Sequence, residues 1–268
     1  MKPSIRMNIR KMLYCLAILL GWLGGHCQGV HAQDSGSSTL DGRAISQFVS
    51  AGLAYRAGRY EEAIRRYEEI LQKGRESGAL YYNLGNSYFK EGDLGRAVLN
   101  YERARRLIPR DSDLNFNYRY VLSQSGQNIV KNAMSFGEGL IDSYIQFYTR
   151  AEMLVIIIFL SLLIGIAHLL SLYLKWSVRF QKGIIGVLTA VWILYGSGFI
   201  IKIQAERNLA VVVEKTEAKF EPREDATVHF SLNEGAKIKI LKIEGGWIKI
   251  KRPDGKIAWI PQKVLESI

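Results

Sequence analysis

The pattern of hydrophobic and polar positions changes character several times along this 268-residue chain. An apolar run at residues 12–23 follows a basic stretch, helical spacing governs residues 43–125, two long uncharged runs come next, and alternation begins near residue 210. Spacing near 3.6 residues indicates helices, and a period of two indicates half-buried strands. The order predicts a multi-domain membrane protein with an all-α part, a two-helix transmembrane hairpin and an all-β C-terminal part.

The beginning of the chain has the composition of a secretory signal peptide, residues 1–32, with cleavage after Ala32. A lipoprotein signal would need small residues before Cys27, and His26 stands there. The mature chain would carry no thiol, because its only cysteines, Cys15 and Cys27, lie in this segment. Residues 33–42, rich in Ser and Gly, are expected to form a flexible linker. The basic residues before the apolar run are Lys2, Arg6, Arg10 and Lys11.

Two stretches repeat with a period of 34 residues, since Gly58, Ala63 and Tyr67 recur as Gly92, Ala97 and Tyr101. This spacing resembles the tetratricopeptide family, whose units are helical hairpins that stack into an array. Residues 77–111 form the stronger copy, and residues 43–76 form a degenerate copy. The signature positions of the stronger copy are Tyr81, Leu84, Gly85, Tyr88, Ala97, Tyr101, Ala104 and Pro109.

Two repeats are few for a stable array, because about three units are usually needed to bury a continuous core. Residues 112–150 are expected to supply a capping helix and then a juxtamembrane segment. The cap is indicated by Leu114, Tyr118, Val121 and Leu122, which stand at helical spacing.

The resemblance to tetratricopeptide repeats implies that the first helix of each unit lines a concave groove for a protein partner. Asn86 and Lys90 stand one turn apart and resemble half of a carboxylate clamp, although Gly52 replaces the asparagine in the first repeat. An extended or helical peptide with apolar anchors is therefore the expected ligand. The implied partner-binding residues are Phe48, Tyr55, Arg56, Tyr82, Asn83, Asn86, Phe89 and Lys90.

Two uncharged runs, residues 153–174 and 183–201, predict transmembrane helices at residues 151–174 and 183–202, because each run is long enough to cross a hydrocarbon core of about 30 Å. The connection at residues 175–182 carries Lys175, Arg179 and Lys182 without an acid, which places it in the cytoplasm. Both large parts would then lie on the periplasmic side of the inner membrane. His168 stands inside the first span, where it is either satisfied by a neighbouring helix or takes part in proton or metal chemistry.

The last part of the chain, residues 205–268, alternates isoleucine with lysine and has tight turns at Gly245-Gly246 and Asp254-Gly255. The stretches 234–238, 246–247 and 254–261 resemble the bacterial SH3 family, which implies an all-β SH3-like barrel. Trp247 shares a strand face with Lys249 and Lys251, so these three residues form a candidate ligand face, with rim packing as the alternative role of Trp247. Trp259 is expected to belong to the core. Polyproline binding is not expected, because Val264 replaces the groove tyrosine of signalling SH3 domains.

Composition bears on the possible chemistry. The formal charge is +11, and removing the signal peptide with four basic residues lowers it to +7, which favours a place beside anionic lipid and does not indicate a nucleic-acid partner. No ligand-spaced histidine pair, phosphate-binding loop or serine nucleophile elbow is visible in the sequence. We therefore expect no enzymatic activity, no cofactor and no metal.

The order of parts resembles the E component of the Bat (aerotolerance) operon proteins. That resemblance implies partnership with membrane proteins bearing von Willebrand A domains, an associated MoxR-type ATPase and a role in envelope stress or aerotolerance. Two functions remain open from the sequence. One is a membrane-anchored scaffold that binds protein partners in the periplasm, and the other is a sensor of peptidoglycan that acts through the SH3-like domain.

Overall fold

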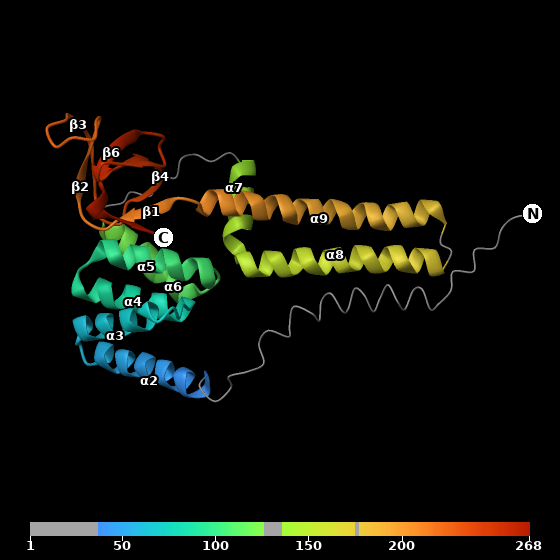
Figure 1. Ribbon diagram of the computed structural model, residues 1–268, viewed down its shortest axis with the longest axis horizontal. Helices are drawn as coiled ribbons and strands as arrows, with labels where there is room; N and C mark the ends of the chain where they lie inside the picture. Colours follow the sequence, from blue (N-terminus) through green and yellow to red (C-terminus); the bar gives the residue numbers. More distant parts are fainter. Residues whose placement is uncertain (1–36, 126–135, 175–176) are drawn as a thin grey trace, which may run out of the picture. The chain divides into compact units, whose positions relative to one another are not determined.

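The computed structural model describes residues 37–125, 136–174 and 177–268. The predicted signal peptide lies outside the described residues, and so do Lys175 and Trp176 of the predicted loop. The described chain begins with helices, labelled α2 to α9, and ends with strands β1 to β7 (Figure 1).

Five helices make up the repeat region and its cap. The second of the two repeats is the hairpin of α4 and α5, and α6 follows it directly. Residues 37–42 are helical, so the prediction of a linker up to residue 42 was wrong for them. Serine and threonine also occur in the first turns of helices, and composition alone does not separate such a turn from a linker. The bounds are α2 Ser37–Arg56, α3 Tyr60–Gln72, α4 Gly78–Glu91, α5 Leu94–Leu107 and α6 Ser112–Gln124.

Side-chain caps fix where α4, α5 and α6 begin. The Ser77 hydroxyl accepts a hydrogen bond from the backbone N–H of Leu80 at 3.1 Å. The carboxylates of Asp93 and Asp111 each accept a bond of 2.8 Å from the backbone N–H three residues further on. Each such cap is worth about 1 kcal/mol. Helix α4 ends at Glu91 and is capped by Gly92, whose φ of 91° favours glycine because a Cβ would be strained there.

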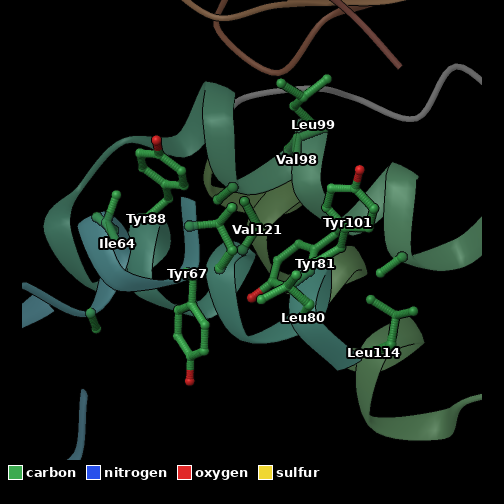
Figure 2. Packing of buried hydrophobic residues seen from close by; sticks show 14 of the residues in the cluster. Ile64, Tyr67, Leu80, Tyr81, Tyr88, Val98, Leu99, Tyr101, Leu114 and Val121 are labelled. Atoms are coloured by element: carbon green, nitrogen blue, oxygen red, sulfur yellow. The ribbon is translucent and has the colours of Figure 1, made fainter. Parts of the chain in front are cut away.

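The core of the repeats is filled by aromatic and aliphatic side chains of α3 to α6 (Figure 2). Tyr101 is fully buried and lies against Gly85, where an added Cβ would be 2.8 Å from the tyrosine ring. Gly85 is therefore a small residue that lets the two helices of the second repeat approach. Larger side chains at that position would force the two helices of the second repeat apart.

A helical hairpin follows, formed by α8 (Arg150–Tyr173) and α9 (Val178–Glu206), which lie side by side in Figure 1. Both helices are long and apolar enough to cross a membrane. Trp192 of α9 donates a hydrogen bond of 2.9 Å to the Ser161 hydroxyl of α8. Helix α9 extends beyond the predicted span of residues 183–202 at both ends. Hydropathy marks only the apolar part of such a helix, while lysine and arginine at its ends are good helix formers.

A shorter helix, α7 (Phe136–Phe147), packs against the C-terminal part of α9. An added Cβ on Gly198 would be 2.7 Å from the Tyr144 ring, so the absence of a side chain at Gly198 lets this ring pack against α9. Lys202 is buried and donates a hydrogen bond of 2.7 Å to the carbonyl oxygen of Ile145. A cation on the last carbonyls of a helix is favourable because it meets the negative end of the helix dipole.

The C-terminal strands form one antiparallel sheet with the order β3-β2-β6-β5-β4-β1-β7. Hydrogen bonds leave β3 and β7 as its edges, so the sheet is not a closed ring. Its single core nevertheless contains Ala210 of β1 and Leu232 of β3, which means that the sheet curves back on itself. The bounds are β1 Leu209–Val212, β2 Thr216–Lys219, β3 Val228–Leu232, β4 Lys237–Glu244, β5 Trp247–Lys251, β6 Ile257–Pro261 and β7 Leu265–Ser267.

The first strand joins the sheet to the repeats because both of its faces are buried. Ala210 and Val212 point into the core of the sheet, whereas Val211 and, just beyond the strand, Val213 belong to the core of the repeat helices. Gly95 of α5 permits this contact, since an added Cβ would be 2.3 Å from the carbonyl oxygen of Val213. The sheet therefore covers part of the repeat core that α6 leaves open.

Candidate functional site

The first-helix face of the repeats carries one aromatic side chain on each of three helices. Phe48 of α2, Tyr82 of α4 and Phe116 of α6 are 34 residues apart. Phe116 is 65 % exposed. Sequence reasoning missed Phe116 because α6 was interpreted only as a cap, although the 34-residue period already extended to it. The three side chains define what we call the aromatic row.

A second set of aromatic contacts lies one to two turns further along the same helices. The rings of Phe89 and Tyr120 meet edge to face, with centroids 5.7 Å apart. Burial raises the pKa of Tyr55, and the hydroxyl groups of Tyr60 and Tyr82 raise it further. The rings of Tyr55 and Tyr60 have centroids 5.5 Å apart. Tyr120 is half exposed and was also not foreseen. This surface offers apolar area together with hydroxyl groups, a combination typical of protein-binding surfaces.

Asn86 lies at the centre of a hydrogen-bond network between the repeat and the cap. Its Oδ1 accepts from the Tyr101 hydroxyl at 2.6 Å and from Asn117 Nδ2 at 3.1 Å. The same Nδ2 group also donates to the Tyr82 hydroxyl at 2.9 Å. The amide oxygen of Asn86 thus holds α6 against α4. A role for Asn86 in binding a carboxylate stays a prediction, and its Nδ2 group is the part that suits it.

Basic side chains recur at one repeat position next to the aromatic row. Arg56 and Lys90 are 34 residues apart and both are exposed. Asn83 is half-buried and lies about two turns before Lys90 on the same helix. A partner with acidic groups beside its apolar anchors would complement these cations. The remaining predicted binding residues lie on the same two helices: Tyr55 on α2, and Tyr82, Asn86 and Phe89 on α4.

The outer face of the sheet carries the predicted ligand face of Trp247, Lys249 and Lys251. All three alternate along β5 with the buried Ile248 and Ile250. The face is wider than the sequence indicated, because Lys219 of β2 holds its ammonium group 5.7 Å from the centre of the Trp247 ring. Lysines and half-buried aromatic rings therefore share this face.

Trp259 lies on this same outer face, and the prediction that it belongs to the core was wrong. It pairs with Lys249 on one side and with Lys219 on the other, and the Lys249 ammonium group lies 5.7 Å from its ring centre. The physical reason is the alternation of β6, where Ala258 and Ile260 take the inward positions.

Family models match two separate parts of the chain, one in the repeats and one in the sheet. Residues 54–114 match the tetratricopeptide repeat family model. Residues 220–266 match the bacterial SH3 domain family model. The first match extends to Leu114 and so includes the start of α6. No curated protein matches the chain. Repeats and SH3-like domains of these kinds indicate interaction with proteins or with peptidoglycan.

A buried ion cluster connects the two domains behind these surfaces. Glu102 of α5 is almost fully buried, and its carboxylate is 2.9 Å from Lys237 Nζ of β4 and 3.6 Å from Arg105. The Tyr118 hydroxyl of α6 donates to the same carboxylate. Burial alone would raise the pKa of Glu102, but the two cations and the hydrogen bonds hold it below its ordinary value. The carboxylate is therefore ionised at neutral pH and links α5, α6 and β4.

Within residues 37–125, 136–174 and 177–268, no group of three or more His, Cys, Asp and Glu side chains is placed to hold a metal ion. His229 stacks on Phe220 with ring centroids 4.3 Å apart. His168 is exposed on α8.

Proposed function

We propose that this protein is a non-enzymatic scaffold, anchored in the inner membrane by α8 and α9, whose repeats bind a segment of a protein partner in the periplasm. The observation that carries the proposal is the aromatic row of Phe48, Tyr82 and Phe116. Side chains that repeat at one position on the alternate helices α2, α4 and α6, one of them largely exposed, suit an apolar peptide laid across those helices.

The periplasmic orientation is part of the proposal. It is supported by the basic connection between the spans, with Arg179 and Lys182 at the start of α9 and Lys175 before it. Both soluble parts then lie on one side of the membrane. Because β1 packs into the repeat core, the two binding surfaces are held together as one body.

We propose further that the complex acts in aerotolerance or envelope stress, with membrane proteins that bear von Willebrand A domains as the partners. This step is supported by the order of domains that resembles the E component of the Bat operon proteins. The outer face of the sheet would supply the second contact of the scaffold.

Affinity capture with the detergent-solubilised full chain tests whether the aromatic row and its neighbouring rings form the groove that binds the partner. The variant Phe116→Ser with Tyr120→Ser removes two exposed aromatic groups, and neither ring belongs to the buried core of the repeats. We expect it to lose at least about tenfold in recovered partner, because aromatic anchors carry most of the energy of such interfaces. Val228→Ser, which alters an exposed apolar side chain on the edge strand β3, is the matched control. Equal recovery with all three proteins would refute the groove as the binding site.

A second candidate function is the sensing of peptidoglycan through the SH3-like domain. It is favoured by two tryptophans, Trp247 and Trp259, that lie beside lysines on the outer face of the sheet. Sedimentation of the full chain with purified sacculi tests it, with Trp247→Ala as the diagnostic variant. An isolated domain would be unsuitable, because it would expose Val211 and Val213. Sedimentation that is absent, or unchanged by Trp247→Ala, removes this candidate.

A further inference from the structure

The β4–β5 hairpin ends in apolar side chains that nothing in the sheet covers. Leu241 is 45 % exposed and Ile243 is 57 % exposed, although Ile243 pairs in register with the buried Ile248. Leu241 is the extra residue of a β-bulge, since Ile240 and Lys242 face consecutive residues of β5. The hairpin therefore extends beyond the core of the domain and carries two aliphatic groups at its end. We call residues 241–249 the hairpin tip.

Lysines lie on the outer face of this hairpin, opposite to the face of Ile243, and face one another across the strands. Lys242 pairs in register with Lys249, and Lys239 pairs with Lys251. Like charges directly opposite on a sheet are destabilising. Glu244 lies 2.7 Å from Lys242, and Lys249 approaches the Trp259 ring, while no described carboxylate is placed against Lys239 or Lys251 within ion-pair distance. The Lys242–Lys249 pair in the tip and the Lys239–Lys251 pair next to it thus keep a net positive charge.

The sheet is connected so that the tip returns toward the membrane hairpin. Helix α9 ends at Glu206, and β1 begins only three residues later, at Leu209. Strand β4 is antiparallel to β1, with Lys239 opposite Leu209 and with the N–H of Ile240 bonded to the Asn208 carbonyl at 2.8 Å. Residues after Ile240 therefore run past the start of β1, on the side from which the chain arrives from α9.

We propose that the hairpin tip lies in the headgroup layer of the membrane and binds anionic phospholipid. Leu241 and Ile243 would enter the layer, and Lys242 and Lys249 would meet the lipid phosphates. Helix α9 has 29 residues and a length of about 44 Å, more than a hydrocarbon core of about 30 Å needs, so its last turns reach this layer. A hairpin with an aliphatic group on one face and lysines on the other has the chemistry of a surface-bound membrane segment.

Charge and tethering favour lipid over a soluble ligand for this tip. The short connection from α9 keeps the tip beside the bilayer at all times, which gives lipid a high effective concentration. Each lysine near an anionic surface contributes about a fivefold factor in binding. The inference rests on the membrane anchorage proposed above, and it assigns to Lys249 a lipid contact at the border of the tryptophan face.

Accessibility of a spin label tests this contact in the full chain. The label is placed at Ile243→Cys or, as the matched control, at Val228→Cys on β3, in a background with Cys15→Ser and Cys27→Ser. The protein is reconstituted in nanodiscs of phosphatidylglycerol with phosphatidylethanolamine, or of phosphatidylcholine alone. In the anionic discs we expect collisions with a water-soluble nickel chelate to be about fivefold fewer at position 243 than at position 228. Equal accessibility of the two sites there would overturn the proposal.

Charge reversal then identifies the lysines involved. Lys242→Glu with Lys249→Glu is expected to restore nickel access at position 243 in anionic discs to the level in phosphatidylcholine discs. Lys256→Glu with Lys263→Glu changes the net charge equally at exposed positions outside the tip and is expected to leave the access unchanged. Equal effects of the two pairs would overturn the assignment to the tip.

The other occupants of the tip give different results, and each overturns the lipid assignment. Shielding that appears only when peptidoglycan fragments are added to phosphatidylcholine discs assigns the tip to the cell wall. Shielding that is equal in both lipids and lost on dilution assigns it to a second copy of the chain. A label at Leu162→Cys in α8 distinguishes failure of the membrane anchorage from failure of the lipid contact. If the nickel chelate reaches position 162, the proposed anchorage is refuted. If position 162 is shielded and position 243 is accessible, only the lipid contact of the tip is refuted.

Discussion

At the scale of single residues, the buried Glu102 has the largest consequences because three elements depend on its charge. It lies within ion-pair distance of Lys237 and Arg105 and accepts a hydrogen bond from Tyr118. A buried carboxylate of this kind is costly by itself and is retained only where its partners compensate the lost hydration. Its partners come from α5, α6 and β4. The charge of Glu102 is therefore fully compensated only when the sheet is packed against the repeats.

Removal of this carboxylate should loosen the contact between the domains. We expect Glu102→Ala to lower the free energy of unfolding by about 2 kcal/mol, because the Tyr118 hydroxyl loses its acceptor in a buried place. Urea unfolding of the detergent-solubilised chain measures the effect. Glu61→Ala, which breaks an exposed pair with Arg65, should change the free energy by less than about 0.5 kcal/mol. A similar loss for both variants would contradict the role given to Glu102.

Acid should weaken the same contact in a defined direction. The folded-state pKa of Glu102 is lowered from the ordinary value of 4.5, so its contribution is fully present above pH 4.5 and is lost as the pH falls through the folded-state value. We expect hydrogen exchange of β1 to accelerate below that pH, relative to exchange in β5, after correction for the intrinsic rate. In Glu102→Gln the group no longer titrates, and this component of the acid response should disappear. An unchanged response would show that other carboxylates cause it.

At the scale of elements, α6 has two roles, and the helical spacing of its apolar residues indicates only one of them. Its buried residues cap the repeat core, and its exposed Phe116 and Tyr120 extend the face of the first helices. The hydrogen bonds from Asn117 to Asn86 and Tyr82 set its distance from α4. A variant of Asn86 therefore changes the position of α6 as well as any contact with a ligand.

The network predicts a structural effect of Asn86→Ala. Tyr101 and Asn117 would lose their shared acceptor, so we expect amide exchange in α6 to become faster by about five- to tenfold, equivalent to about 1 kcal/mol. Lys90→Ala changes an exposed side chain on the same face and should leave exchange in α6 unchanged. If Asn86→Ala reduced partner binding with no change in α6, the asparagine would instead contact the ligand directly.

Much of the element plan is readable from the sequence, and the failures have physical causes. The 34-residue period indicates the repeats, and the alternation of isoleucine with lysine indicates the sheet. Trp259 was misplaced because an apolar residue on a strand favours an inward position, whereas its neighbours Ala258 and Ile260 fill the core. The double role of β1 was hidden, since a run such as Leu209–Val213 shows no alternation when both faces are buried.

At the scale of the whole molecule, the sheet completes the repeats, and this makes the two domains mutually dependent. Val211 and Val213 lie in the core of the repeats, and Arg103 and Arg106 of α5 donate to the carbonyl oxygens of Ser267 and Ile268 at 2.7 Å each. A two-repeat array lacks the neighbours that usually stabilise such units. The sheet would supply one of them.

Close packing at Gly95 allows this dependence to be tested without removing a domain. In Gly95→Val the added side chain would overlap the Val213 backbone, where even a Cβ would be 2.3 Å from the carbonyl oxygen. We expect a loss of about 2 kcal/mol and faster exchange in α5, α6 and β1 together. Gly139→Ala, with no atom within 4 Å of its added Cβ, is the control and should be neutral or slightly stabilising. Faster exchange in β1 alone would mean that the repeats are stable without the sheet, and that the binding surfaces are only tethered neighbours.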